Sequence, residues 1–223
     1  IRDSKKAVLG IEHAQCAIER STLDRLDLES GSEGSVQATV VGMLFASTGA
    51  KMHLLNDVTI ETPTLTRLAI VVDGATLDSS GVLVKTGKPE ILVRNANLRL
   101  SQVVSDNGAT VVVKAEGAGH CDVDPRSCVV HREGETTSEV RWRAADNEDF
   151  ERVVAPLLAS DATVILEEGN YSIESVPKHV RDLTLRGAKR DATVLAISGS
   201  LNADNGGRLI VEDMTLLQAD GHN

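Results

Sequence analysis

A seven-residue pattern recurs along this chain and constrains its fold more than any other feature. The six copies are LDRLDLE (23–29), LNDVTIE (55–61), VDGATLD (72–78), VRNANLR (93–99), VRDLTLR (180–186) and VEDMTLL (211–217). Successive copies begin 32, 17, 21, 87 and 31 residues apart. Such a loose period indicates fixed strands that are separated by loops of variable length.

Within each copy, positions one, four and six are mostly apolar. Positions four and six lie on the same face of a strand, because side chains alternate with a period of two. Position three is Asp, Asn, Gly or Arg, which favours a turn just before the strand. One such unit cannot bury its apolar face alone, whereas stacked units can. The sequence therefore predicts an all-β fold, a parallel β-solenoid in which each strand pairs with the strand of the next coil.

The stretch from Val164 to Ile197 combines an apolar strand, a Gly169-Asn-Tyr171 turn, the strand VRDLTLRG and the strand ATVL. This order resembles the opening coils of a right-handed parallel β-helix of the pectate-lyase-like superfamily. The resemblance implies the right-handed fold but no single activity, because that superfamily includes lyases, esterases, hydrolases and non-catalytic scaffolds. The segment GNYSIE is similar to an early element of pectin esterases. The catalytic motifs that follow it there are missing here, so we expect a non-catalytic chain and a fragment of a longer protein.

One segment departs from the strand pattern. In residues 146–160 the apolar side chains follow helical spacing, and Asp146 or Asn147 is a suitable N-cap. Pro156 should end this amphipathic helix early. We expect residues 1–143 to form a first solenoid region, with residues 117–143 as a connector. Residues 144–223 would then hold a capping helix and the start of a second solenoid, or the continuation of the first.

Four metal-ligating side chains lie close together in the sequence: His120, Cys121, Cys128 and His131. They suit a tetrahedral zinc site in kind, but their spacing matches no common zinc finger. A hairpin with residues 124–127 as its turn would instead bring the two cysteines together. A zinc site, a disulfide and free thiols therefore remain as alternatives, and no cofactor is predicted.

A second constellation consists of two carboxylates. Asp182 and Asp213 occupy the same position of the repeat, so they could lie in neighbouring coils. Stacked carboxylates can form acid–base pairs or calcium sites. An Asp or Asn at a repeated turn more commonly bonds its own backbone, and Asp57 and Asn95 hold the same position. The two residues are thus weak candidates for catalysis.

Composition excludes several function classes. The net charge is −10, with 19 acidic and 16 basic residues up to position 143 and 14 acidic and 7 basic residues after it. Neither part offers the basic stripe that nucleic-acid binding requires, and no apolar run is long enough for membrane insertion. Aromatic residues are only 2% of the chain. With Trp142 expected in the connector and Tyr171 in a turn, a carbohydrate partner is possible but disfavoured.

These observations favour a non-catalytic β-helix scaffold that presents its faces to a protein partner within a larger protein or assembly. The alternative is a truncated carbohydrate-active β-helix, similar to a pectin lyase or esterase, or a polysaccharide-binding module. We also expect self-association or partner binding through an open C-terminal end. Leu185 and Leu216 are predicted to lie in the interior of adjacent coils.

Overall fold

The computed structural model describes residues 1–2, 8–61, 68–85, 89–105, 108–144, 150–198 and 207–218. Within these residues the chain is an all-β parallel β-solenoid with one short helical segment, as the repeat predicts. It forms two compact units, Ile1–Glu133 (unit 1) and Gly134–Asn223 (unit 2). None of the described helices is long and apolar enough to cross a membrane.

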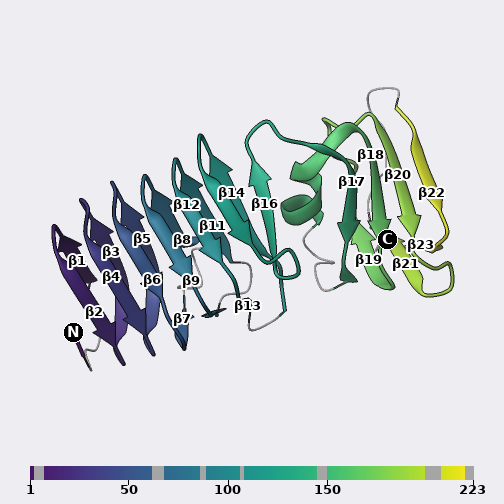
Figure 1. Ribbon diagram of the computed structural model, residues 1–223. Helices are drawn as coiled ribbons and strands as arrows, with labels where there is room; N and C mark the ends of the chain where they lie inside the picture. The colour runs from purple at the N-terminus through teal and green to yellow at the C-terminus, as the bar shows by residue number, and fades with distance from the viewer. Residues whose placement is uncertain are drawn as a thin grey trace. The chain divides into compact units, whose positions relative to one another are not determined.

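Unit 1 stacks its coils in sequence order from the N-terminus (Figure 1). Its described strands are β1 (Val8–Glu12), β2 (Gln15–Glu19), β3 (Thr22–Glu29), β4 (Glu33–Gln37), β5 (Val40–Ser47), β6 (Lys51–Leu54), β7 (Val58–Ile60), β8 (Leu68–Asp73), β9 (Thr76–Ser79), β10 (Val82–Val84), β11 (Glu90–Arg94), β12 (Asn97–Leu100), β13 (Val103–Ser105), β14 (Val111–Glu116), β15 (His120–Val123) and β16 (Cys128–Arg132).

The strands of unit 1 form two parallel sheets. A six-stranded sheet runs in the order β15-β12-β9-β6-β4-β2. A ten-stranded sheet holds the rest, and its long strand β5 pairs with two different strands. The start of β5 pairs with β7 and its end pairs with β8. The early coils therefore have two strands each, and the coils from β7 onward have three.

Left-handed residues mark one corner of the coils in unit 1, between the ten-stranded and the six-stranded sheet. They have φ between 44° and 77° and are His13, Ser30, Gly31, Thr48, Gly49, Gly74, Asn95 and Gly117. Gly117 cannot be replaced without movement, because a Cβ there would collide with the Asn95 side chain. Asn95 Oδ1 also accepts a hydrogen bond from the backbone N–H of Ala118 at 3.0 Å. The turn expected at position three of the repeat is confirmed at Asp57, Gly74, Asn95 and Asp213, all with positive φ.

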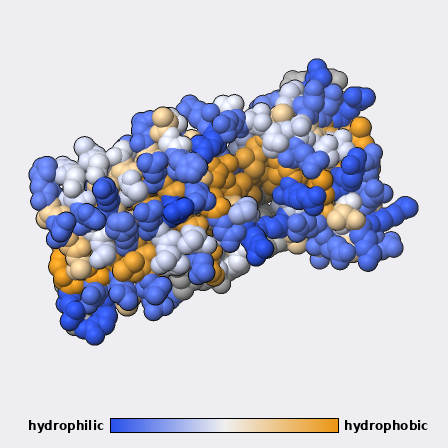
Figure 2. Space-filling view, in the orientation of Figure 1, coloured by the Kyte–Doolittle hydropathy of each residue, from blue (hydrophilic) through white to orange (hydrophobic). Residues whose placement is uncertain are grey.

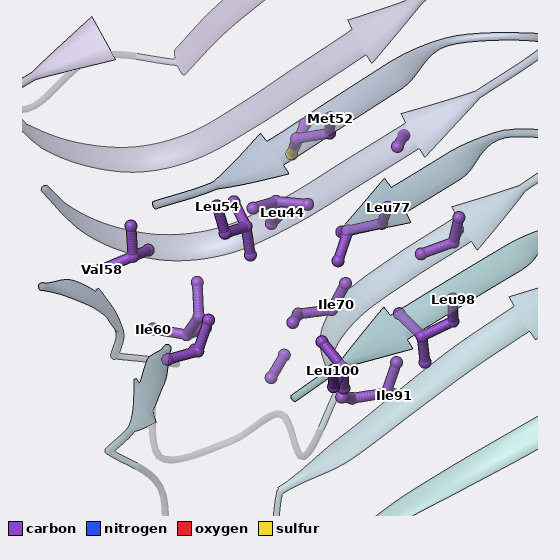
Figure 3. Packing of buried hydrophobic residues seen from close by; sticks show 14 of the residues in the cluster. Leu44, Met52, Leu54, Val58, Ile60, Ile70, Leu77, Ile91, Leu98 and Leu100 are labelled. Carbon is purple, nitrogen blue, oxygen red and sulfur yellow. The ribbon is translucent and has the colours of Figure 1, made fainter. Parts of the chain in front are cut away.

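The core of unit 1 lies between its sheets and is almost entirely aliphatic. Leu44 and Ile70 of the ten-stranded sheet point toward Met52 and Leu77 of the six-stranded sheet (Figure 3). Each inward side chain stacks on its register partner in the next coil, as Met52 does on Leu77. Burial of these stacked side chains away from water stabilises the solenoid, because each coil contacts only its neighbours in the stack.

Unit 2 has two smaller parallel sheets. Its elements are β17 (Thr137–Trp142), a π-helical turn η2 (Phe150–Val154), a 3-10 turn η3 (Ala155–Leu157), β18 (Leu158–Leu166), β19 (Gly169–Ile173), β20 (Asp182–Gly187), β21 (Thr193–Ile197), β22 (Leu209–Glu212) and β23 (Thr215–Gln218). The sheet orders are β17-β18-β20-β22 and β19-β21-β23. Residues 117–143, expected as a connector, thus contain three strands: β15, β16 and β17.

The predicted helix is shorter than its apolar pattern. The described part starts at Phe150, changes to a 3-10 turn at Ala155 and ends at Leu157. Pro156 accounts for this end, because it lacks the N–H that an α-helix needs and disfavours helix in the preceding residue. Leu158 accordingly belongs to β18. The expected N-cap, Asp146 or Asn147, lies outside the described residues.

Three aromatic rings form one cluster in unit 2. The ring centroid of Trp142 lies 4.9 Å from that of Phe150 and 4.8 Å from that of Tyr171. Trp142 is 1% exposed, and the Tyr171 hydroxyl donates a hydrogen bond of 3.0 Å to the Trp142 carbonyl oxygen. Both sequence expectations for these residues were wrong, since Trp142 lies in β17 and Tyr171 in β19. The residues next to Trp142 and Tyr171 in the sequence favour turns, but burial of the two rings stabilises the strands that carry them.

The two predicted interior leucines differ. Leu185 is fully buried and pairs in register with Val211 of the next coil. Leu216 pairs with Leu195 in the other sheet and is 50% exposed, so its prediction was wrong. Leu216 is aligned with the fully buried Leu195, but no described strand pairs with the outer edge of β23, so no described coil covers it. It also lies in a different sheet from Leu185, because the repeat copy at 211–217 spans the corner between β22 and β23.

Candidate functional site

The His–Cys constellation is not brought together. His120 and Cys121 are adjacent on β15, so they point to opposite faces: His120 is exposed and Cys121 packs against the core. On β16, Cys128 is buried in the core, whereas His131 pairs in register with the exposed Lys114. The two cysteines face inward and the two histidines face outward, which does not assemble a four-ligand zinc site.

The hairpin expected between the cysteines was wrong. β15 pairs with β12 in the six-stranded sheet, and β16 pairs with β14 in the ten-stranded sheet. Residues 124–127 do form a turn, in which Asp124 Oδ1 accepts a hydrogen bond of 2.9 Å from the Arg126 N–H. It is a corner of the coil rather than a hairpin. None of the three cysteines forms a disulfide, and burial raises the pKa of the Cys121 thiol. A raised pKa makes this thiol a poor nucleophile.

Asp182 and Asp213 do not stack on one another. The register places Asp213 beside Gly187, where its carbonyl oxygen occupies the space that a Cβ would need. Asp182 instead pairs in register with Asp161 of the preceding coil. Arg181 Nη2 lies 3.1 Å from Asp161 Oδ1 and 3.4 Å from Asp182 Oδ2, so it bridges the two carboxylates. The described residues contain no group of three or more His, Cys, Asp or Glu side chains that could hold a metal ion.

Asp182 joins the coils electrostatically. Its Oδ1 accepts a hydrogen bond of 2.9 Å from the Arg208 N–H, and this bond, with the Arg208 and Arg181 charges, lowers the pKa of Asp182. Because the pKa is lower in the folded state, the carboxylate stabilises the fold above its unfolded pKa. This contribution is lost as the pH falls through the lower, folded pKa.

We therefore expect acidification to weaken the pairing of β20 with β22. Hydrogen exchange of the β22 amides, measured at several pH values and corrected for intrinsic rates, should show less protection in acid. Asp182→Asn removes the titrating group and should show a smaller change over the same range. An unchanged pH dependence in that variant would assign the effect to other carboxylates.

A groove in unit 1 is a concave feature formed by described residues. It has a volume of about 360 Å³ and lies where the six-stranded sheet meets β7, β10 and β13. We call it the corner groove. Its lining residues are Asn56, Asp57, Val58, Thr59, Ser80, Gly81, Val82, Gln102 and Val104. All belong to three consecutive coils of unit 1.

The parallel register aligns the groove. Val58, Val82 and Val103 are register partners, so Asp57, Gly81 and Gln102, which precede them, form one column across the coils. Gly81 has no side chain, so the column is open at its position. A Cβ added there would meet only Gln102 Oε1, at 3.9 Å, so the missing side chain leaves open space. Backbone bonds from Ser80 to Leu54 and from Val82 to Gln102 hold the corner rigid.

Four polar side chains of the corner groove are available to a ligand, and those of Asn56, Asp57 and Gln102 are exposed to solvent. In the described part of the chain, no side-chain hydrogen bond or ion pair involves Asn56, Asp57, Thr59 or Gln102. Beside them Val104 is 60% exposed. Because Val58 and Val82 are buried in the core, Val104 supplies the exposed apolar contact beside these polar groups, and ligand-binding sites commonly combine the two kinds of contact.

The corner groove is suited to binding rather than to catalysis. Asp57 is its one carboxylate, and its lining includes no His, Cys, Lys or Arg. Hydrolysis of a glycosidic bond ordinarily uses two carboxyl groups, and a nucleophile needs an adjacent base. The groove thus supplies hydrogen-bond acceptors, donors and apolar contact.

Comparison with protein-family models, with curated proteins and with solved structures finds no match to this chain. The resemblance to the pectate-lyase-like superfamily therefore stays a prediction, whereas the parallel solenoid itself is confirmed by the strand register.

Sequence reasoning missed the corner groove. A signal was present, because each of its three coils carries short polar residues just after a strand of the six-stranded sheet: Asn56-Asp57, Ser80-Gly81 and Ser101-Gln102. Only the first of these pairs falls inside a copy of the repeat. Aligning the coils by strand, rather than by the repeat, would have shown the column.

Proposed function

We propose that this chain is a non-catalytic β-solenoid module that binds a protein partner through the corner groove. The observation that carries the proposal is the combination of exposed Val104 with four polar side chains that make no side-chain hydrogen bond or ion pair within the described residues. On the visible face of unit 1, polar residues lie beside bands of apolar surface (Figure 2). Outside the corner groove, charged side chains of unit 1 form ion pairs, as Arg94 Nε does with Glu116 Oε2 at 2.6 Å. Paired surface charges offer little to a partner.

Filling the corner groove should abolish partner binding. Gly81→Trp places an indole in the open space without backbone strain, since Gly81 does not have a left-handed φ. The matched control is Gly10→Trp, because Gly10 of β1 has no atom within 4 Å of its Cβ position and lies outside the groove. A displayed peptide library is selected on the unchanged chain. We expect the enriched peptides to bind Gly10→Trp normally and to lose binding to Gly81→Trp.

Two results would contradict the proposal. One is a selection that enriches no peptide above background. The other is a set of enriched peptides that bind Gly81→Trp as well as they bind the unchanged chain, because these peptides would then occupy another surface.

A carbohydrate ligand is the second candidate. The amides of Asn56 and Gln102 and the hydroxyl of Thr59 can bond sugar hydroxyls. No aromatic residue lines the groove, however, and sugar rings are commonly bound on aromatic faces. Phe45 is covered by Arg25, whose guanidinium lies 4.1 Å from the ring centroid. Binding or cleavage of polygalacturonate or its methyl ester would favour this candidate over a protein partner.

The last described coil offers another surface for interaction. Ile210, Leu216 and Leu217 are exposed there, and no described strand pairs with the outer edges of β22 and β23. We expect the chain to self-associate or to bind a partner at this edge, and Glu212 and Asp213 should weaken pairing between identical copies. Sedimentation velocity over a range of concentrations measures the association, and Leu217→Glu should reduce it. A strict monomer with slow hydrogen exchange in β23 would show that the edge is already covered.

A further inference from the structure

We propose that the corner groove recognises an arginine side chain of the protein partner. This inference rests on the proposed function and names the chemistry of the contact. The guanidinium lies over Gly81, with Asp57 on one side and Gln102 on the other. Its aliphatic stem packs against Val104.

Charge selects a cation. Asp57 is the only ionisable residue that lines the groove, and it has no ion-pair partner among the described residues. The chain as a whole carries a net charge of −10. The local and the long-range potential therefore both favour a basic group over an acidic one.

The spacing of the acceptors favours arginine over lysine. Asp57, Gly81 and Gln102 belong to successive coils, and neighbouring strands lie about 4.8 Å apart. Gln102 leans toward the middle coil, where its Oε1 lies 3.9 Å from the Cβ position of Gly81. A planar guanidinium with five N–H groups can donate in both directions from that point. A lysine ammonium is compact and strongly hydrated, so it satisfies one side only.

The apolar wall accommodates the rest of the side chain. Val104 is exposed on β13 and is the apolar side chain of the groove that this stem can contact, because Val58 and Val82 are buried in the core. Arginine buries its methylene stem along apolar surface while its charged end stays at the polar rim. The absence of a side chain at Gly81 lets the guanidinium approach the backbone, which a larger residue would prevent.

The test is an NMR titration of the isotope-labelled chain with the tripeptide acetyl-Gly-Arg-Gly-amide. Its twin carries citrulline, which has nearly the same shape and no charge. We expect saturable shifts for the backbone amide of Gly81 and the side-chain amides of Asn56 and Gln102 with the arginine peptide. The lysine peptide should bind about tenfold more weakly, and the citrulline peptide at least as much so.

The matched variant is Asp57→Asn. Asparagine tolerates the left-handed φ of 62° at this position, so the corner should keep its fold. We expect this variant to lose about tenfold in affinity for the arginine peptide. Equal binding of the arginine and citrulline peptides, or unchanged affinity in Asp57→Asn, would overturn the inference. If library peptides still depend on Gly81 in that case, the groove binds protein by other chemistry and only the arginine assignment fails.

Discussion

Trp142→Ala should lower the free energy of unfolding of unit 2 by about 3–5 kcal/mol, the largest loss that we expect from a single substitution. The Trp142 side chain is buried and contacts both Phe150 and Tyr171. Its removal leaves a cavity between β17, β19 and η2, which are held in place by different neighbours and cannot simply collapse. Chemical denaturation followed by circular dichroism measures the change.

Tyr171→Phe is the control for this prediction. It keeps the aromatic packing and removes only the hydroxyl that donates to the Trp142 carbonyl oxygen. We expect a smaller loss, of about 1 kcal/mol, as for a single neutral hydrogen bond. If Trp142→Ala costs no more than Tyr171→Phe, the aromatic cluster does not hold unit 2 together.

Leu185→Ala should cost about 2–5 kcal/mol in the free energy of unfolding. Leu185 is fully buried on β20 and stacks between Val164 of the preceding coil and Val211 of the next. Both neighbours are fixed by backbone pairing, so the space left by the leucine stays open. The same denaturation experiment reports the loss.

Thr184→Ala tests whether the side-chain direction matters. Thr184 precedes Leu185 on the same strand and points to the outer face. We expect its substitution to change stability by only about 0.5 kcal/mol. A loss for Leu185→Ala that is equally small would mean that the assigned register of β20 is wrong.

The fold was predictable because stacked coils impose the same alternation on every strand. Leu23, Leu185 and Val93 are inward-facing for the same reason, and the sequence shows it at each of them. The position of a strand within a coil was not predictable from that pattern. The copies at 93–99 and 211–217 span a corner, whereas the copy at 180–186 runs into the strand β20. Side-chain alternation is the same in both settings, so the pattern placed Leu216 beside Leu185 and Asp213 beside Asp182, which the structure does not show.

The candidate site was harder to predict than the fold. The His–Cys cluster was prominent in the sequence because its members are close along the chain, yet strand alternation separates His120 from Cys121. In the corner groove, by contrast, Asp57 and Gln102 are far apart in the sequence, and the parallel strand register brings them into one column. Gly81 could not be identified as a site residue from the sequence, because glycine has no functional group. It matters because Asp57 and Gln102 flank it in the neighbouring coils.

The placement of the aromatic residues has a consequence for spectroscopy. Trp142 is the only tryptophan and Tyr171 the only tyrosine of the chain, and both belong to unit 2. Tryptophan and tyrosine fluorescence therefore report on unit 2 alone, while the unit that carries the corner groove contributes only the weak signal of Phe45. Gly81→Trp would give unit 1 a fluorophore of its own. In a Trp142→Phe background, its tryptophan emission would report the unfolding of unit 1 separately from that of unit 2.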